Sequence, residues 1–572
     1  MRIIIEDYPY DEKELRQVIP SRLLNLPNKK GQIRPPYVGY CFNPEINDCI
    51  FFLPKVVLTK DKNEEKDITG RGLVFDQYNP KDLLSLEKTK EIDKVDKNFL
   101  QKFSIWIYRA LNVFYKNTDT SIVSKHSFSE VDSSTKTKDG TLIDTFLSLI
   151  RFARENKDYV MFEIKNIHSG YNRVNWKKTI SHQVPIRQKK SPLYINPINK
   201  KKQIDFDEEL FIIYFSILEY IHKQFGFNVE INYNYETIKG SQFTHYLNGY
   251  GKIRLRQIKY KYFHDKALKL WSMCYTFFEN SDLLHSSKGV EDFLIAKDFE
   301  NVFEKMVEHL LGEEVPKGLK DQNDGKIVDH LYPYTSLINT DASIYHIADS
   351  KYYKVGSKIG KESIYKQFTY AKNIIQLTLD IFFKDISETE KFDEGYLPYR
   401  DDLTEGYNIT PNFFISAKIE KEETQERYSF SNDNLEQRID KYGKPFYNRL
   451  IQFENRIFDR DTLFLSHYDI NFLYLIALYV KNNHYEQSSF KKKARNLFRD
   501  MVIKLLDLHY EFYLVDPSPL SLEDFVDTNF KELNGKLFHF NGKLIMGLEK
   551  NHIESQRIYT SYKNLLTKYI LF

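Results

Sequence analysis

The sequence GKIVDHLYPYTSLINTDASIYHIADSKYYK, residues 325 to 354, contains two apolar runs that each carry an aspartate, Asp329 and Asp349. The second run, Ser343 to Asp349, is rich in β-branched and aromatic residues, which favours a β-strand. Side chains two positions apart in a strand share a face, so Asp349 and Lys351 point the same way. If the runs pair as a hairpin around the polar connection 337 to 342, both carboxylates converge beside one ammonium.

Paired carboxylates next to a lysine suit phosphodiester chemistry with a divalent cation. Mg2+ is held by one or two protein carboxylates and completes its shell with water and phosphate. The lysine can orient or deprotonate the attacking water, or neutralise charge in the transition state. The pattern of Asp329, Asp349 and Lys351 resembles the PD-(D/E)XK nuclease motif, with Val328 in place of the motif's proline and no obvious strand between residues 312 and 325.

Predicted helices on either side of these runs add further candidates. Apolar periodicity indicates helices over 291 to 311, with Glu304, and over 361 to 383, with Gln367. The nuclease resemblance implies that such an acid lies near the metal and such an amide near the scissile phosphate. The alternatives are turn-capping aspartates, a solvated acidic stripe that includes Glu304, and an ordinary surface amide at Gln367. His330 and His346 could touch the metal, but we interpret them as satisfied polar residues.

Length and composition predict a multidomain globular protein of the α/β class. A chain of 572 residues suggests three or four domains, and 41% apolar with 15% aromatic residues can fill their cores. Three cysteines are too few for a disulfide framework, and the start lacks the pattern of a secretory signal, so we expect a cytoplasmic protein. The apolar run 463 to 480 is interrupted by polar residues, which favours a buried helix over a membrane span.

Four domains are expected along the chain. They are a small β-rich N-terminal domain at 1 to 90, a mainly helical domain at 91 to 285, a PD-(D/E)XK nuclease domain at 286 to 420, and a mainly helical C-terminal domain at 421 to 572. The order helix, strand, strand, helix, strand from about 290 to 420 is the observation behind the third domain.

A basic segment within the second domain is the candidate nucleic-acid surface. Residues 164 to 204 contain ten Lys or Arg and no Asp or Glu, with aromatic residues interspersed, whereas the whole chain has a net charge of only +3. Such a segment can neutralise phosphates and stack bases, although a solvated loop or a partner-docking surface are alternatives. The predicted DNA-binding residues are Arg173, Trp176, Lys177, Lys178, Arg187, Lys189 and Lys190.

Several phrases of the sequence resemble the LlaJI family of restriction endonucleases, whose nuclease subunits are similar to McrC. They are SGYNRVNWKKTI (169 to 180), FDEEL (206 to 210), IADSKYY (347 to 353) and HYDINFLY (467 to 474). The resemblance implies a Mg2+-dependent DNA endonuclease that acts beside an McrB-like AAA+ GTPase subunit. The segment 356 to 363 lacks the spacing of a phosphate-binding loop, which fits a separate GTPase.

The family pattern carries catalytic roles to Asp329, Asp349, Lys351, Glu304 and Gln367. Asp329, Asp349, Glu304 and the backbone carbonyl of Ser350 would bind Mg2+. We therefore expect a type II/IV-like restriction endodeoxyribonuclease that cuts double-stranded DNA in phage defence, with two copies per cleavage complex and no membrane contact. The alternatives are a non-catalytic adaptor that binds DNA and stimulates an AAA+ motor, and a stand-alone resolvase or repair nuclease.

Overall fold

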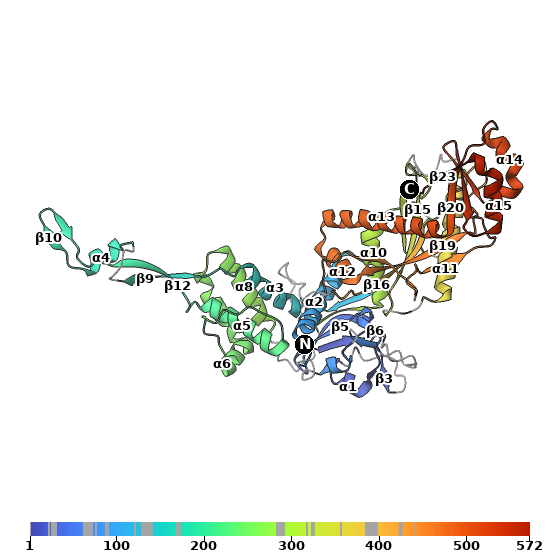
Figure 1. Cartoon of the computed structure of the whole chain (residues 1–572). Helices are drawn as coiled ribbons and strands as arrows, with labels where there is room; N and C mark the ends of the chain where they lie inside the picture. The colour runs from blue at the N-terminus through green and yellow to red at the C-terminus, as the bar shows by residue number, and fades with distance from the viewer. Residues whose placement is uncertain are drawn as a thin grey trace.

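The computed structural model describes residues 2–20, 23, 31–60, 72–74, 77–85, 91–118, 122–126, 141–167, 173–281, 292–315, 319–321, 327–354, 357, 359–383, 399–422, 427–440 and 442–571. Figure 1 shows an N-terminal sheet lobe, a helical lobe from which a long arm projects, and a larger lobe with two further sheets. The fold is thus mixed α/β.

The N-terminal sheet has five strands in the order β1-β5-β4-β13-β8. Their bounds are β1 Arg2–Ile5, β4 Tyr37–Asn43, β5 Asp48–Leu53, β8 Val123–His126 and β13 Asp292–Lys297. Gly39 lets β4 and β13 approach closely, because a Cβ there would lie 2.2 Å from the carbonyl oxygen of Leu294. Helix α2 (Lys94–Asn117) packs against β4, β5 and β13. The sheet therefore extends beyond residues 1 to 90 and includes a strand from within 286 to 420.

The helical lobe and its arm lie between residues 141 and 281. Helices α3, α5 and α7 each pack against α8; their bounds are α3 Leu142–Glu155, α5 Glu209–Phe225, α7 Gly251–Ile258 and α8 Asp265–Glu279. The arm begins as an antiparallel pair of β9 (Phe162–Ile167) and β12 (Asn199–Ile204) and continues through α4 (Trp176–His182) to the hairpin of β10 (Ile186–Gln188) and β11 (Ser191–Leu193). Figure 1 shows the arm extending away from the rest of the chain.

The second sheet carries the quoted stretch and runs β14-β15-β16-β19-β17, with β18 also paired to β19. The bounds are β14 His330–Thr335, β15 Ser343–Lys351, β16 Asn412–Lys418, β17 Leu435–Gln437, β18 Tyr447–Leu450 and β19 Leu463–Asn471. β14 and β15 form the expected antiparallel hairpin, and β15, β16 and β19 are parallel. Helices α10 (Phe299–Leu311) and α11 (Lys361–Phe383) both pack against β15, so residues 286 to 420 supply most of this sheet, and β17 to β19 lie beyond them.

The apolar run 463 to 480 is not one helix. Its first part is β19, and its second part is α12 (Phe472–Lys481), which Asn471 caps by accepting a hydrogen bond from the Leu473 N–H at 3.1 Å. Strands pair with β19 on both sides, and these long-range bonds outweigh the local helical pattern. No helix in the described part of the chain is long and apolar enough to cross a membrane.

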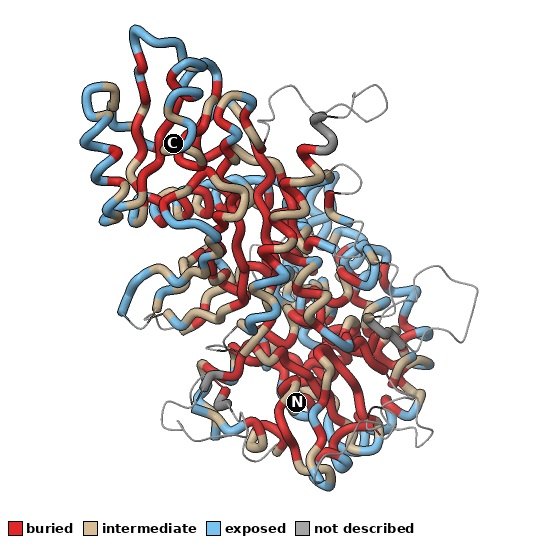
Figure 2. Tube along the Cα trace, turned by 90° about the vertical axis from the view of Figure 1, so that its right-hand side faces the viewer, coloured by how far each residue is buried: buried red, intermediate tan, exposed pale blue. Residues whose placement is uncertain are grey.

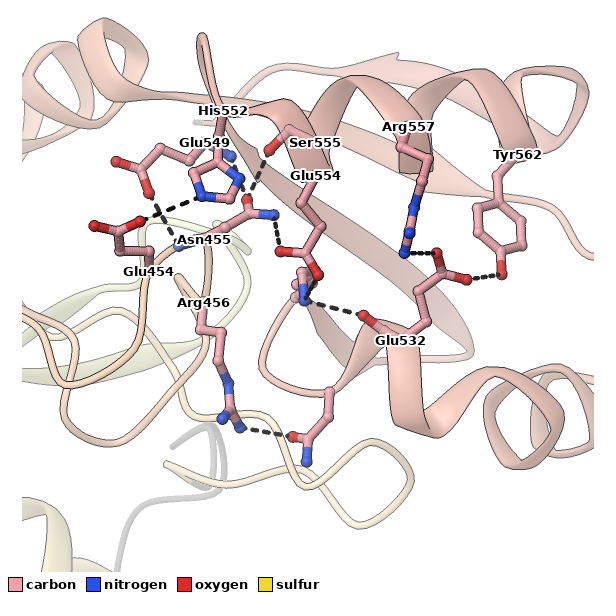
Figure 3. A network of polar contacts seen from close by, with 12 residues as sticks. Glu454, Asn455, Arg456, Glu532, Glu549, His552, Glu554, Ser555, Arg557 and Tyr562 are labelled. Carbon is pink, nitrogen blue, oxygen red and sulfur yellow. Dashed lines mark hydrogen bonds and ion pairs between the residues drawn. The ribbon is translucent and has the colours of Figure 1, made fainter.

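The C-terminal range 421 to 572, expected to be mainly helical, also holds a four-stranded antiparallel sheet of order β21-β22-β20-β23. The elements are α13 His484–His509, β20 Tyr510–Val515, α14 Leu522–Leu533, β21 Leu537–Phe540, β22 Lys543–Glu549, α15 Ile553–Tyr562 and β23 Leu566–Tyr569. Asn455, in the chain between β18 and β19, bonds Glu549 and Glu554 of this sheet unit (Figure 3). The strands are only four to seven residues long, and β20 pairs with β22 and β23 across intervening helices, so most of this sheet has little local signal in the sequence.

Two apolar cores enclose the second sheet. One continues from the N-terminal and helical lobes into the α10 face and includes Ala348, Tyr352 and Ile415. The other lies under α11 and includes Ile347, Phe414 and Ile374. Figure 2 shows the strands of both lobes as continuous buried segments. Because β15 is covered on both faces, its residues 344 to 350 are all buried, including the polar ones.

Candidate functional site

Asp329 and Asp349 meet at the end of the β14–β15 ladder. His330 pairs with Ala348, so Asp329, the residue before β14, lies beside Asp349. The backbone N–H of Ser350 donates to Asp329 Oδ2 at 3.0 Å, which fixes the Asp329 carboxylate against β15. Asp329 is half-buried, whereas Asp349 is only 4% exposed. The hairpin thus brings together the two acids that the sequence places twenty residues apart.

Lys351 completes this group from the same face of β15. Its Nζ forms an ion pair with Asp349 Oδ2, and the ammonium lies 5.4 Å from the centre of the Phe414 ring on the neighbouring strand. The Lys351 side chain is 13% exposed, so much of its stem is covered by protein. Asp329, Asp349 and Lys351 therefore converge as the sequence pattern predicts.

Burial sets the electrostatics of the three groups. Burial first, and then the charge of Asp329, raise the pKa of Asp349 well above its usual range, against the opposing effect of Lys351. Burial lowers the pKa of Lys351, but Asp349 and Asp329 raise it by more, and the net shift is upward. Lys351 is consequently an ammonium at neutral pH. A second negative charge beside Asp329 is unfavourable in this buried place, and a cation would relieve that cost.

Glu304 lies on α10 near the same acids. Burial, followed by the charges of Asp329 and Glu300, raises the pKa of Glu304 to about 7, while Lys351 and Lys305 oppose the shift. The carboxyl is partly buried and can gain or lose a proton near neutral pH. Its electrostatic coupling to Asp329 and Lys351 places it at the edge of the site.

A second polar chain runs across the opposite face of β15. His330 Nε2 lies 2.5 Å from Ser350 Oγ, and His330 Nδ1 lies 2.8 Å from Glu308 Oε2. Glu308 also pairs with Lys320. Burial raises the pKa of Glu308, but hydrogen bonds from His330 and Lys320 lower it by more. This series of polar contacts fixes the Ser350 side chain, and the Ser350 backbone N–H in turn fixes the Asp329 carboxylate.

Glu308, together with Lys320, holds His330 in place, and the sequence patterns did not single out either residue. The available signal was the spacing of Glu304 and Glu308, which puts both on one helix face. The second histidine considered near the metal, His346, is fully buried, and its Nε2 lies 3.3 Å from the Thr335 carbonyl oxygen. Its Nδ1 has no hydrogen-bond partner among the described residues, and burial lowers its pKa to about 3.

The Gln367 amide is buried, and its Oε1 has no hydrogen-bond partner among the described residues. It is 1% exposed, and its Nε2 donates to Asn412 Oδ1 of β16 at 2.8 Å. The preceding residue, Lys366, is exposed, and its pKa is raised first by Tyr370 and further by Asp349 and Asp329. Lys366 on α11 therefore also lies within electrostatic reach of the two acids.

The carboxylates of Asp329 and Asp349 are the candidate oxygen donors for Mg2+. Among the described residues, no group of three or more His, Cys, Asp or Glu side chains could hold a metal ion. Two carboxylates with room for water and phosphate are nevertheless a common donor set for Mg2+. Asp329 and Asp349 fit this set, and their mutual repulsion favours a cation between them. Glu304 is not part of such a group.

The chain directly before β14 makes one short backbone pairing. Asp321 forms an isolated antiparallel bridge with Ile327, and the Val328 N–H donates to the Lys320 carbonyl at 3.0 Å. Residues 316–318 and 322–326 lie outside the described residues, as do Gly356 and Lys358 of the segment considered as a phosphate loop. The described residues thus show a short backbone pairing in the segment before β14, where the sequence showed no obvious strand.

The basic residues predicted to bind DNA lie on the arm, far from the acid pair in Figure 1. Each of them is exposed: Arg173, Trp176, Lys177, Lys178, Arg187, Lys189 and Lys190. Lys189 has a φ of +51° in the hairpin turn between β10 and β11, a conformation that side-chain-bearing residues rarely adopt. Residues 169 to 172, which begin the family phrase on this arm, lie outside the described ranges.

Comparisons with solved structures give a distant match. No family model matches the chain, and no curated protein matches it. A solved structure described as the refined half-complex from a tetradecameric assembly of Thermococcus gammatolerans McrB AAA+ hexamers with bound McrC aligns with 86% of this chain and 99% of that chain. The identity is 10% and the TM-score is 0.27. A TM-score this low does not establish a common fold.

Proposed function

We propose that this chain is the Mg2+-dependent DNA endonuclease subunit of a restriction system and works with an McrB-like AAA+ GTPase subunit. The observation that carries the proposal is the convergence of Asp329, Asp349 and Lys351 at the end of one hairpin. The partner and the biological setting follow from the sequence phrases that resemble the LlaJI family. Phage defence is the process in which such a pair would act.

The residues of the hairpin divide the work of phosphodiester hydrolysis. Asp329, Asp349 and the backbone carbonyl of Ser350 would hold Mg2+, which when bound supplies Lewis acidity and a water of lowered pKa. The Ser350 N–H keeps the Asp329 carboxylate in place through its 3.0 Å bond. Burial of Asp349 excludes bulk water from one side of the pair.

Lys351 acts as a proton donor and not as a base. Asp349 and Asp329 stabilise its ammonium, so it carries its proton at neutral pH. A charged ammonium can orient an attacking water and donate to the phosphate oxygens as negative charge develops there. Glu304, with a pKa of about 7, can take up the proton that such a water releases. Lys366 would contact a neighbouring phosphate.

The arm supplies a separate phosphate-binding surface. Its exposed lysines and arginines would neutralise DNA phosphates, and exposed Trp176 can stack on a base or sugar. The chain has one acid pair of this kind among its described residues, and cutting both strands of a duplex requires two such sites. Two copies of the chain would therefore act in each cleavage complex.

The test uses the full chain purified with the AAA+ protein encoded beside it. Plasmid DNA, GTP and Mg2+ are added, and linear product is measured for wild type, Asp349→Ala and Asp341→Ala. Asp341 is the matched control, because it is an exposed acid in the turn of the same hairpin. We expect wild type and Asp341→Ala to cut and Asp349→Ala to lose cutting by at least about 100-fold.

Equal cutting by wild type and Asp349→Ala would refute the assignment. A chain that cuts nothing but raises GTP hydrolysis by its partner, in both wild type and Asp349→Ala, would point to the adaptor alternative. Cutting of branched or damaged DNA without any partner would point to a stand-alone nuclease.

A further inference from the structure

Tyr352, the residue directly after Lys351, is bound by the N-terminal lobe. Its hydroxyl donates to Glu6 Oε2 at 2.5 Å, across 346 residues of sequence. Glu6 directly follows β1 of the N-terminal sheet, and its carboxylate is 4% exposed. The end of β15 that carries Lys351 is therefore anchored in another lobe.

The acceptor of this hydrogen bond is held rigidly. Glu6 Oε2 also accepts the backbone N–H of Lys55 at 3.0 Å. The Lys55 ammonium lies 4.9 Å from the centre of the Tyr352 ring and pairs with Asp7 at 3.1 Å. The other charged groups that act on this cluster are Lys354, Glu300 and Arg34.

The Tyr352 ring joins this cluster to α10. Its centre lies 5.5 Å from that of Phe299 and 5.8 Å from that of Phe303, both on the helix that carries Glu304. Tyr352 thus contacts the N-terminal lobe and the Glu304 helix while it is bonded covalently to Lys351. These contacts meet at one fully buried side chain.

Packing alone does not account for the polar pair. A phenylalanine at position 352 would make the same ring contacts. Burial of the Glu6 carboxylate costs free energy, so the polar pair must contribute something that apolar groups cannot. Burial raises the pKa of Glu6 to about 7, against the opposing effects of Lys55 and Tyr352. A directional bond at this place fixes the orientation of the strand end.

We propose that Glu6 and Tyr352 are positioning residues through which the N-terminal lobe sets the place of the Lys351 ammonium relative to Asp349. The proposal rests on the proposed nuclease function. A displacement of the lobe, such as binding of a partner could produce, would act on β15 through this bond and change the rate of the reaction without any contact to DNA.

The test compares wild type with Tyr352→Phe, Glu6→Met and the double variant, each as the full chain with its AAA+ partner. Tyr214→Phe is the matched control, because that buried tyrosine also loses a hydroxyl bond, to the Leu149 carbonyl at 2.9 Å, but in the helical lobe. Two quantities are measured: the single-turnover cleavage rate at saturating DNA with GTP and Mg2+, and amide hydrogen exchange of residues 343 to 354.

We expect Tyr352→Phe and Glu6→Met each to slow cleavage about tenfold with unchanged DNA affinity and to speed exchange at 343 to 354. The double variant should be no slower than Glu6→Met, because either substitution removes the bond between Tyr352 and Glu6. Tyr214→Phe should change neither quantity.

Wild-type cleavage and exchange in Tyr352→Phe would overturn the proposal, as would equal slowing by Tyr214→Phe. If the wild type itself does not cut, the nuclease function fails. Exchange at 343 to 354 then decides separately whether the lobe fixes the strand end, and unchanged exchange in Tyr352→Phe would overturn that too.

Discussion

Replacement of Glu304 by glutamine gives a pH-dependent gain in stability. Glutamine keeps the size of the side chain but stays uncharged, so it removes only the ionisation of a group that the folded protein disfavours. Glu304 owes its raised pKa first to burial and then to Asp329 and Glu300. The variant should therefore be increasingly more stable than wild type as the pH rises.

The magnitude follows from the pKa in the folded and unfolded states. Between pH 4.5 and about 7 the folded protein holds a proton on Glu304 that the unfolded chain has lost, so wild-type stability falls as pH rises through this window. A change of one in pKa corresponds to about 1.36 kcal/mol, so the difference between 4.5 and about 7 corresponds to about 3.4 kcal/mol. Because the side chain is partly exposed, screening by solvent reduces this to roughly 2 kcal/mol.

Pulse proteolysis of the full chain in urea at pH 5, 6, 7 and 8 measures this difference in stability. The band to follow is the protease-resistant part that contains the second sheet. We expect the difference in unfolding free energy between Glu304→Gln and wild type to be small at pH 5 and to reach roughly 2 kcal/mol at pH 8. Glu314→Gln, on the exposed segment after α10, controls for the chemical change itself. A difference that stays constant or shrinks as the pH rises would refute the reasoning.

Three further predictions concern other parts of the molecule. Lys351→Met should lower single-turnover plasmid cleavage about 100-fold to 1000-fold with folding intact, and a loss below about tenfold would contradict its role as a donor. Arg495→Met should lower the free energy of unfolding by about 3 kcal/mol in urea titrations, because Arg495 is buried and donates to the Leu311 carbonyl at 2.6 Å. A decrease below about 1 kcal/mol would show that this bond contributes little to stability. The double variant Lys177→Ala, Arg187→Ala should lower the slope of log DNA affinity against log salt concentration, measured by fluorescence anisotropy, by about 0.9 for each lost phosphate contact. An unchanged slope would show that DNA does not bind this part of the arm.

The hairpin and its acids could be predicted because their signals are local. Alternating faces of a strand placed Asp349 and Lys351 together, and the polar turn between the two runs set their pairing. Apolar periodicity indicated the helices that carry Glu304 and Gln367, but the first was expected over 291 to 311, and residues 292 to 297 of that range form β13 instead. The DNA-cleaving chemistry, the Mg2+ and the partner remain predictions.

The features that could not be predicted depend on pairing between distant segments. β13 lies among nuclease-like elements in sequence, yet it pairs with β4 and β8. The direction of Gln367 depends on a rotation of α11 that periodicity does not fix to one residue, and Asn412 provides the partner for its amide. The bond between Glu6 and Tyr352 has no sequence signal, because nothing local marks either residue as its partner.

The position of β13 also limits how this protein can evolve. Only Asp298 separates β13 from α10, so the N-terminal sheet and the Glu304 helix share one uninterrupted piece of chain. A fragment that began at residue 286 would keep β13 without β4 or β8 and expose both edges of an apolar strand, which promotes aggregation. A fragment that ended before β13 would open the first sheet between β4 and β8. The two lobes therefore cannot be exchanged as end-to-end modules and must be inherited as a unit.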